Sequence, residues 1–112
     1  MSEPRALSVR VVLTTAPSAE VAEELGAAVV AERLAACANI VPGITSIYHW
    51  EGEIQREGET LVIFKTTEST VGRLRARLVE LHPYDVPEVV VMAVEAGHEP
   101  YLSWVRDEVV PR

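Results

Sequence analysis

The order of strand-forming and helix-forming segments constrains this chain of 112 residues more than any other feature. Two segments with a helical spacing of apolar residues, 19–35 and 68–82, are each preceded and followed by short runs rich in β-branched residues. The two middle runs follow one another without a helix between them, and a helical pattern at 99–109 closes the chain. With right-handed crossovers, this order predicts an α+β fold, a ferredoxin-like βαββαβ sandwich with a C-terminal helix, in which two helices cover one face of a four-stranded antiparallel sheet.

Three local signals refine this prediction. Ser18 is placed to cap the first helix, because its side chain can accept a hydrogen bond from a backbone N–H at the helix start. Gly26 lies in the middle of that helix, where glycine costs up to about 1 kcal/mol against alanine, so we expect close packing there. Pro42-Gly43 interrupts the second strand and predicts a bulge, a bend or an edge position, because proline donates no hydrogen bond to a sheet. The strands are predicted at residues 8–15, 36–50, 60–67 and 88–96.

The second and third strands are predicted to form a long hairpin. The sequence EGEIQREGE between them supplies turn residues, and a tip at Glu57-Gly58 would place Trp50 opposite Lys65. A long hairpin with an uncovered edge and aromatic side chains favours contact with another chain. An oligomer is therefore predicted.

Composition indicates a folded globular protein and argues against several functions. The chain is predicted to be one domain, 1–112, with its core at about residues 8–109. Seventeen acidic and ten basic residues give a net charge of −7 without a basic cluster, which argues against nucleic acid as a partner. No stretch approaches the roughly 20 apolar residues of a membrane span, and the N-terminal apolar run is too short for a signal peptide. A single cysteine fits a reducing compartment, so a cytoplasmic location is expected.

The standard catalytic signatures do not occur in the sequence. It contains no G-x-S-x-G, H-E-x-x-H, P-loop or G-x-G-x-x-G motif. No catalytic residue is predicted, and the chain is interpreted as a protein that is not an enzyme. Acid–base catalysis by Lys65, His82 and Tyr84 is the weakest hypothesis, because nothing fixes a substrate or a nucleophile.

Two residues are candidate metal ligands. Cys37 lies in the apolar joint between the first helix and the second strand, where a free cysteine either packs as a small hydrophobic residue or binds a soft metal such as Cu(I). His82 ends the second helix, where it either caps and packs or acts as a ligand. His49 and His98 have the positions of surface residues.

A set of aromatic and charged residues is predicted to form either a ligand pocket or an interface. Lys65 is the only lysine and lies in an apolar strand, where a buried ammonium needs a partner. Glu88 is a suitable partner, and the aromatic members lie near the hairpin or the C-terminus. The set consists of Tyr48, Trp50, Lys65, Glu88, Tyr101 and Trp104.

Several separated motifs together resemble the CutA family of divalent-cation tolerance proteins. They are RLAACANIVPGITSIYHWEGEI, LVIFKTT, LHPYDVPEVV and YLSWV, in matching order and spacing across residues 9–109. The resemblance implies a ferredoxin-like subunit, a PII-like homotrimer built through long hairpin strands, and a role in tolerance of metal ions with weak binding of copper or another divalent cation. The alternative is a PII-like signalling or scaffold trimer whose intersubunit cleft binds a small anion or a partner protein.

The positions of the family carry over to this chain motif by motif. Cys37 matches the cysteine of the C-A-N-I segment, and His82 matches the histidine of the H-P-Y motif. Some copper-linked members have a cysteine before T-A-P and a second histidine before H-P-Y, where this chain has Thr14 and Leu81, so high-affinity copper binding of that style is not expected. The other matching positions are Tyr48, Trp50, Lys65, Pro83, Tyr84, Pro87, Glu88, Tyr101 and Trp104.

The segment between the second helix and the last strand is predicted to be a stiff joint. Pro83 and Pro87 fix φ near −65° and disfavour helix in the residues before them. The joint is therefore predicted to hold His82, Tyr84 and Glu88 in fixed directions at the border of an intersubunit cleft.

Overall fold

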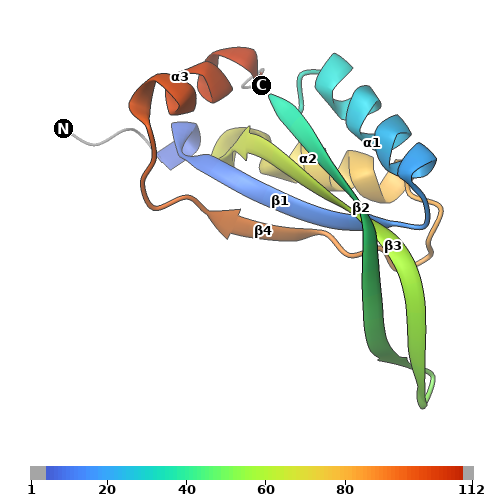
Figure 1. The fold of residues 1–112 in the computed structure, drawn as a ribbon. Coiled ribbons are helices and arrows are strands. Elements are labelled where there is room, and N and C mark those ends of the chain that lie inside the picture. The colour runs from blue at the N-terminus through green and yellow to red at the C-terminus, as the bar shows by residue number, and fades with distance from the viewer. Residues whose placement is uncertain (1–4, 110–112) are drawn as a thin grey trace.

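The computed structural model of the protein describes residues 5–109 and confirms the predicted α+β sandwich. Its antiparallel sheet has the strand order β2-β3-β1-β4, and helices α1 and α2 lie over one face of the sheet (Figure 1). No helix within residues 5–109 is long and apolar enough to cross a lipid bilayer. The elements are η1 (Arg5–Leu7), β1 (Val9–Ala16), α1 (Ala19–Ala31), β2 (Cys37–Trp50), β3 (Glu53–Thr67), α2 (Glu68–Leu81), β4 (Val90–Ala93) and α3 (Glu99–Glu108).

The main core lies between the two helices and the covered face of the sheet. Val12, Val62 and Phe64 from the strands are fully buried there, together with Val29 of α1 and Leu74 of α2. These strand residues point to one face because side chains alternate along a strand. The strand residues between them must therefore face the other side of the sheet.

This other side, which we call the open face, is apolar and only partly covered. Helix α3 packs at one end of it, where Val105 is buried against Val9 and Ala36. The rest is half-buried or exposed, and Met92 and Val90 each keep more than 40% of their surface accessible. The apolar residues of the open face are Val11, Leu13, Val41, Leu61, Ile63, Val90 and Met92.

Strand β2 carries one extra residue, which confirms the predicted bulge. Val41 pairs with Leu61 and Ile44 pairs with Glu59, so β2 advances three residues while β3 advances two. Gly43, within the bulge, has a φ of +79°, a left-handed conformation that glycine adopts without strain. As a result, even-numbered residues of β2 after the bulge continue the face formed by odd-numbered residues before it.

The predicted hairpin tip at Glu57-Gly58 is wrong. The turn is Glu51-Gly52, whose φ values of 51° and 81° are typical of a two-residue type I′ turn with a twist that matches the strands. Lys65 pairs with Cys37, at the opposite end of the hairpin from Trp50, so the predicted pairing of Trp50 with Lys65 is also wrong. Both Glu-Gly pairs suit a turn locally, and only the strand register distinguishes them.

The outer part of the hairpin, residues 44–59, projects from the sheet as a two-stranded arm (Figure 1). Within β3, only Thr60–Thr67 pairs with β1, so Glu53–Glu59 pairs with β2 alone. The molecule is consequently elongated, with extents of 50 × 26 × 22 Å. Apolar arm residues such as Ile47 and Ile54 are exposed, the latter at 69%. The long hairpin predicted from the sequence is confirmed.

Strand β3 begins at Glu53 rather than at residue 60, and two other elements are shorter than predicted. Helix α1 ends at Ala31 rather than near residue 35, because Arg33 adopts a left-handed φ of 58° and turns the chain. The Leu34 N–H still donates to the Val29 carbonyl at 2.9 Å, which brings Leu34 into the core from outside the helix. Because the apolar side chain of Leu34 fits the helical period, the sequence pattern predicts a helix that continues beyond its true end at Ala31. Strand β4 is likewise shorter than the predicted 88–96.

The predicted close packing at Gly26 is confirmed and gives a first testable prediction. A Cβ at Gly26 would lie 3.0 Å from the Cβ of Ala38, whereas a Cβ at Gly72 of α2 would have no neighbour within 4 Å. We expect Gly72→Ala to raise the free energy of unfolding by up to about 1 kcal/mol through helix propensity. Gly26→Ala should give a lower value than Gly72→Ala, because its new methyl group must displace Ala38. Urea unfolding of both variants measures this, and equal stabilisation would contradict it.

Candidate functional site

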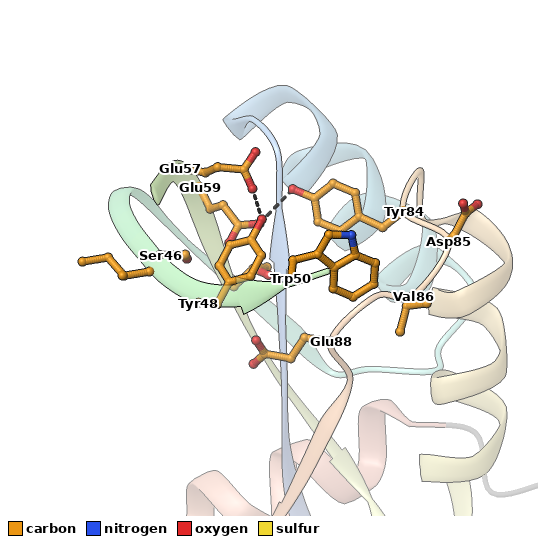
Figure 2. A pocket seen from close by; sticks show the side chains of 11 residues that line it. Ser46, Tyr48, Trp50, Glu57, Glu59, Tyr84, Asp85, Val86 and Glu88 are labelled. Carbon is orange, nitrogen blue, oxygen red and sulfur yellow. Dashed lines mark hydrogen bonds between the residues drawn. The ribbon is translucent and has the colours of Figure 1, made fainter. Parts of the chain in front are cut away.

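A cavity of about 610 Å³, which we call the arm cavity, lies between the arm and the loop after α2 (Figure 2). Tyr48 and Trp50 enter it from the arm, and Tyr84 and Glu88 enter it from the loop. The two prolines of this loop restrict its backbone. The lining residues are Thr15, Ser46, Ile47, Tyr48, Trp50, Glu57, Glu59, Tyr84, Asp85, Val86 and Glu88.

Two tyrosine–glutamate hydrogen bonds organise the wall of the arm cavity. The Tyr48 hydroxyl donates to Oε1 of Glu57, and the Tyr84 hydroxyl donates to Oε2 of Glu59 at 2.8 Å. The bond to Glu57 raises the pKa of Tyr48, while burial and then the bond to Glu59 raise the pKa of Tyr84. Both tyrosine hydroxyls therefore stay protonated at neutral pH and act as hydrogen-bond donors to the glutamate side chains.

The acidic side chains of the arm cavity have no basic partner within residues 5–109. Elsewhere in this part of the chain arginines pair with acids, as Arg77 does with Glu32 at 3.0 Å. None of the lining residues is basic, so the cavity is a region of negative potential. The four acidic lining residues that form no ion pair with a residue in 5–109 are Glu57, Glu59, Asp85 and Glu88.

His82 has a structural position beneath this wall. It is 7% exposed, its Nε2–H donates to the Thr15 carbonyl at 2.7 Å, and its Nδ1 accepts the Tyr84 N–H at 3.1 Å. Since a backbone N–H can only donate, this network assigns the neutral Nε2–H tautomer. The His82 and Tyr84 rings also lie 4.7 Å apart between centroids. The structure thus shows the capping and packing alternative, and His82 holds Tyr84 in the cavity wall.

A second group of predicted residues lies at the other end of the hairpin. The Lys65 ammonium donates to the side-chain carbonyl of Asn39, and the Cys37 sulfur lies 3.6 Å from the Tyr101 hydroxyl. This contact with Cys37, followed by burial, raises the pKa of Tyr101 to about 12. The Trp104 ring lies 5.6 Å from the Tyr101 ring between centroids.

The six residues predicted to form one ligand site or interface therefore form two groups within one chain. Tyr48, Trp50 and Glu88 line the arm cavity, while Lys65 lies with Tyr101 and Trp104. The expected pairing of Lys65 with Glu88 is replaced by the bond from Lys65 to Asn39. A site shared between subunits stays a prediction. His49 and His98 are exposed, as predicted.

Sequence reasoning missed the acidic residues of the arm. Glu57 and Glu59 were assigned to a turn, whereas both lie on β3 and point to the same face. Their spacing of two residues indicates that both side chains point to one face of a strand. The spacing carries this information only when the turn is placed at Glu51-Gly52, because only then do both residues lie on a strand.

The residues predicted to bind a metal do not form a metal site within one chain. Both ring nitrogens of His82 are already hydrogen-bonded. Thr15, the hydrogen-bond partner of His82, lies opposite Leu61 of β3, and Cys37 lies opposite Lys65 of the same strand. Leu61 and Lys65 are four residues apart along β3, so about 13 Å separates the positions of His82 and Cys37 along the strand direction. No three or more His, Cys, Asp or Glu side chains within residues 5–109 form a group that could hold a metal ion. Metal binding by His82 and Cys37 stays a prediction that this geometry does not favour.

The chain is similar to proteins of one family along almost its whole length. The family model described as CutA1 divalent ion tolerance protein matches residues 10–108. A divalent-cation tolerance protein CutA from Thermus thermophilus is 50% identical over 97 residues, which cover 87% of this chain and 94% of the relative. A human protein named CutA is 48% identical over 99 residues, which cover 88% of this chain. The matched region spans about half the length of the animal and plant relatives, and 55% of the human protein.

Solved structures agree with the sequence comparison. The divalent cation tolerance protein from Thermus thermophilus superposes with a TM-score of 0.89 at 48% identity, covering 91% of this chain and 99% of that one. CutA1 from Oryza sativa gives a TM-score of 0.92 at 38% identity, covering 97% of this chain and 100% of the other. The fold and the arm are thus similar to experimental structures across nearly the entire chain.

Proposed function

The chain belongs to the CutA1 divalent ion tolerance family, and on that premise we propose that it acts in divalent-cation tolerance as a homotrimer that binds divalent cations weakly. The cations bind at the carboxylates of the arm cavity. The observation that carries this proposal is the set of four acidic side chains that line the cavity without a basic partner within residues 5–109.

The open face of the sheet supports assembly with further copies of the chain. Its apolar residues cannot be covered by α1 or α2, which pack on the opposite face, and α3 covers only one end. Burial of apolar surface stabilises by about 25 cal/mol per Å², so a contiguous apolar sheet face favours association. The arm adds an exposed edge in β2, whose free backbone groups can extend a neighbouring sheet.

The chemistry of the arm cavity supports weak rather than tight cation binding. Carboxylate oxygens suit hard divalent cations such as Mn²⁺, and one or two carboxylates with water completing the shell give low affinity. The absence of a converging three-ligand group within residues 5–109 agrees with this. A PII-like anion site would need a basic group in the cavity, and the lining contains none.

Metal titration tests the cation proposal. Calorimetric titration of Mn²⁺ and Cu²⁺ into the wild-type protein should give a dissociation constant on the order of 10⁻⁴–10⁻³ M, and the double variant Glu57→Gln/Glu59→Gln should bind at least about tenfold more weakly. Glu20→Gln/Glu23→Gln, which removes two negative charges from α1, is the matched control and should bind as the wild type does. Unchanged affinity in the cavity variant would refute the proposal, and loss of Cu²⁺ binding in Cys37→Ala alone would assign copper to the thiol instead.

A further inference from the structure

We propose that the Tyr84 hydroxyl fixes the direction of the arm relative to the sheet and so acts as a positioning residue for assembly. This role rests on the proposed homotrimer, because the direction of the arm matters where the arm meets a neighbouring chain. It depends neither on a metal ion nor on the charge of the arm cavity.

The base of the arm has the structure of a hinge, which we call the arm hinge and which consists of Pro42-Gly43 and Glu59-Thr60. On β3, Thr60 is the residue nearest the turn that still pairs with β1, and Glu59 pairs with β2 alone. On β2, the bulge at Pro42-Gly43 lies opposite this same point. A bulge disrupts the ladder and bends its strand, so the arm is attached to the sheet most weakly at this level.

The arm is long enough to magnify a small rotation at the arm hinge. From Glu59 to Glu53, beside the turn, β3 advances six residues, or about 20 Å. A rotation of about 10° at the arm hinge therefore moves the end of the arm by about 3–4 Å, which approaches the spacing of about 4.8 Å between paired strands. A neighbouring chain can pair with the arm in one register only if this rotation is restricted.

Tyr84 restricts this rotation because it connects the loop after α2 with the arm hinge. Its hydroxyl donates to Oε2 of Glu59 at 2.8 Å (Figure 2), and within residues 5–109 this is the only side-chain hydrogen bond or ion pair between the arm and another element. Its backbone N–H donates to Nδ1 of His82, and the two rings lie 4.7 Å apart between centroids. Pro83 and Pro87 restrict the backbone on both sides of Tyr84.

The second tyrosine–glutamate bond of the arm cavity provides a matched control. Tyr48 of β2 donates to Glu57 of β3, so both partners lie on the arm and their bond does not cross the arm hinge. Tyr48→Phe and Tyr84→Phe each remove one hydroxyl from the same cavity wall. Only Tyr84→Phe also removes a connection between the arm and the rest of the chain.

Sedimentation equilibrium of the full-length protein over a dilution series tests this role. Without the bond, only a fraction of the free chains holds the arm in the direction that assembly needs, and the net strength of one hydrogen bond sets this fraction at about one in two to one in twelve. Because three chains combine, the concentration at which half of the chains are dissociated should rise about threefold to fortyfold in Tyr84→Phe. In Tyr48→Phe it should stay within about twofold of the wild type.

A conservative variant separates positioning from charge. Glu59→Gln removes the negative charge but keeps a side-chain carbonyl that can accept from the Tyr84 hydroxyl, so it should dissociate at a concentration closer to that of the wild type than Tyr84→Phe does. The Mn²⁺ titration depends on the charge instead, so the cation proposal and the positioning role can fail separately.

The outcomes also distinguish this role from the trimer itself. With circular dichroism showing folded variants, equal dissociation of Tyr84→Phe and Tyr48→Phe, or of Tyr84→Phe and Glu59→Gln, would overturn the role of Tyr84. A folded wild type of single-chain mass would refute the homotrimer, and ¹⁵N relaxation of that form would then test the arm hinge directly. The order parameters of the arm amides should fall from about 0.85 toward about 0.6 in Tyr84→Phe alone, and unchanged values would overturn the role as well.

Discussion

Replacing His82 by alanine should lower the free energy of unfolding by about 2–3 kcal/mol in metal-free buffer. The substitution removes both ring hydrogen bonds and leaves the Thr15 carbonyl and the Tyr84 N–H without their partner. It also leaves a gap where a side chain that is only 7% exposed had been packed. Urea unfolding with a chelator present, at one fixed protein concentration, measures the change.

His49→Ala is the matched control, because His49 is an exposed histidine on the arm. Its effect should stay within about 0.5 kcal/mol. If His82→Ala in metal-free buffer were as stable as this control, the ring would not be structural. A metal-ligand role for His82 would then become the better explanation for its position at the end of α2.

Shortening the arm should convert the protein from three chains per particle to one. Ser46 and Glu57 are cross-strand partners, so residues 47–56 can be replaced by a two-residue Asn-Gly turn without changing the register of the remaining strands. The shortened strand removes the exposed edge and the aromatic residues that we expect to contact neighbouring chains. Sedimentation equilibrium should give three times the 12.3 kDa chain mass for the wild type and a single chain mass for the variant.

Glu51→Asn is the control for the arm experiment. It changes the turn while keeping the arm at full length, and asparagine adopts the positive φ of this position more readily than glutamate. It should sediment as the wild type does. A shortened variant that keeps the threefold mass would show that the open face alone holds the assembly, and a folded wild type of single-chain mass would refute the trimer.

Most of the architecture could be predicted because its signals are local. The cap at Ser18 is present, with its side chain accepting the Val21 N–H at 3.2 Å. The bulge after Val41 follows from a proline that cannot donate to the sheet and a glycine that accepts a left-handed φ. The boundary of α1 was less predictable, because Leu34 keeps the helical period although the chain has already turned at Arg33.

The candidate site was only partly predictable because it depends on register. Tyr48, Trp50 and Glu88, which the sequence assigns to either a ligand pocket or an interface, line the arm cavity. Lys65 was expected beside them, but moving the turn from residues 57–58 to 51–52 places it at the far end of the hairpin. With the turn at residues 51–52, Glu57 and Glu59 lie on β3 and line the arm cavity.

By itself, the sequence determined the order of strands and helices, the face that each element buries and the bulge, because periodicity and backbone restrictions act over a few neighbouring residues. Only the tertiary structure decided which Glu-Gly pair forms the turn, that both nitrogens of His82 are engaged, and that aromatic and acidic side chains share one cavity. These features depend on contacts between segments far apart in the chain, and such contacts leave no repeating pattern in the sequence.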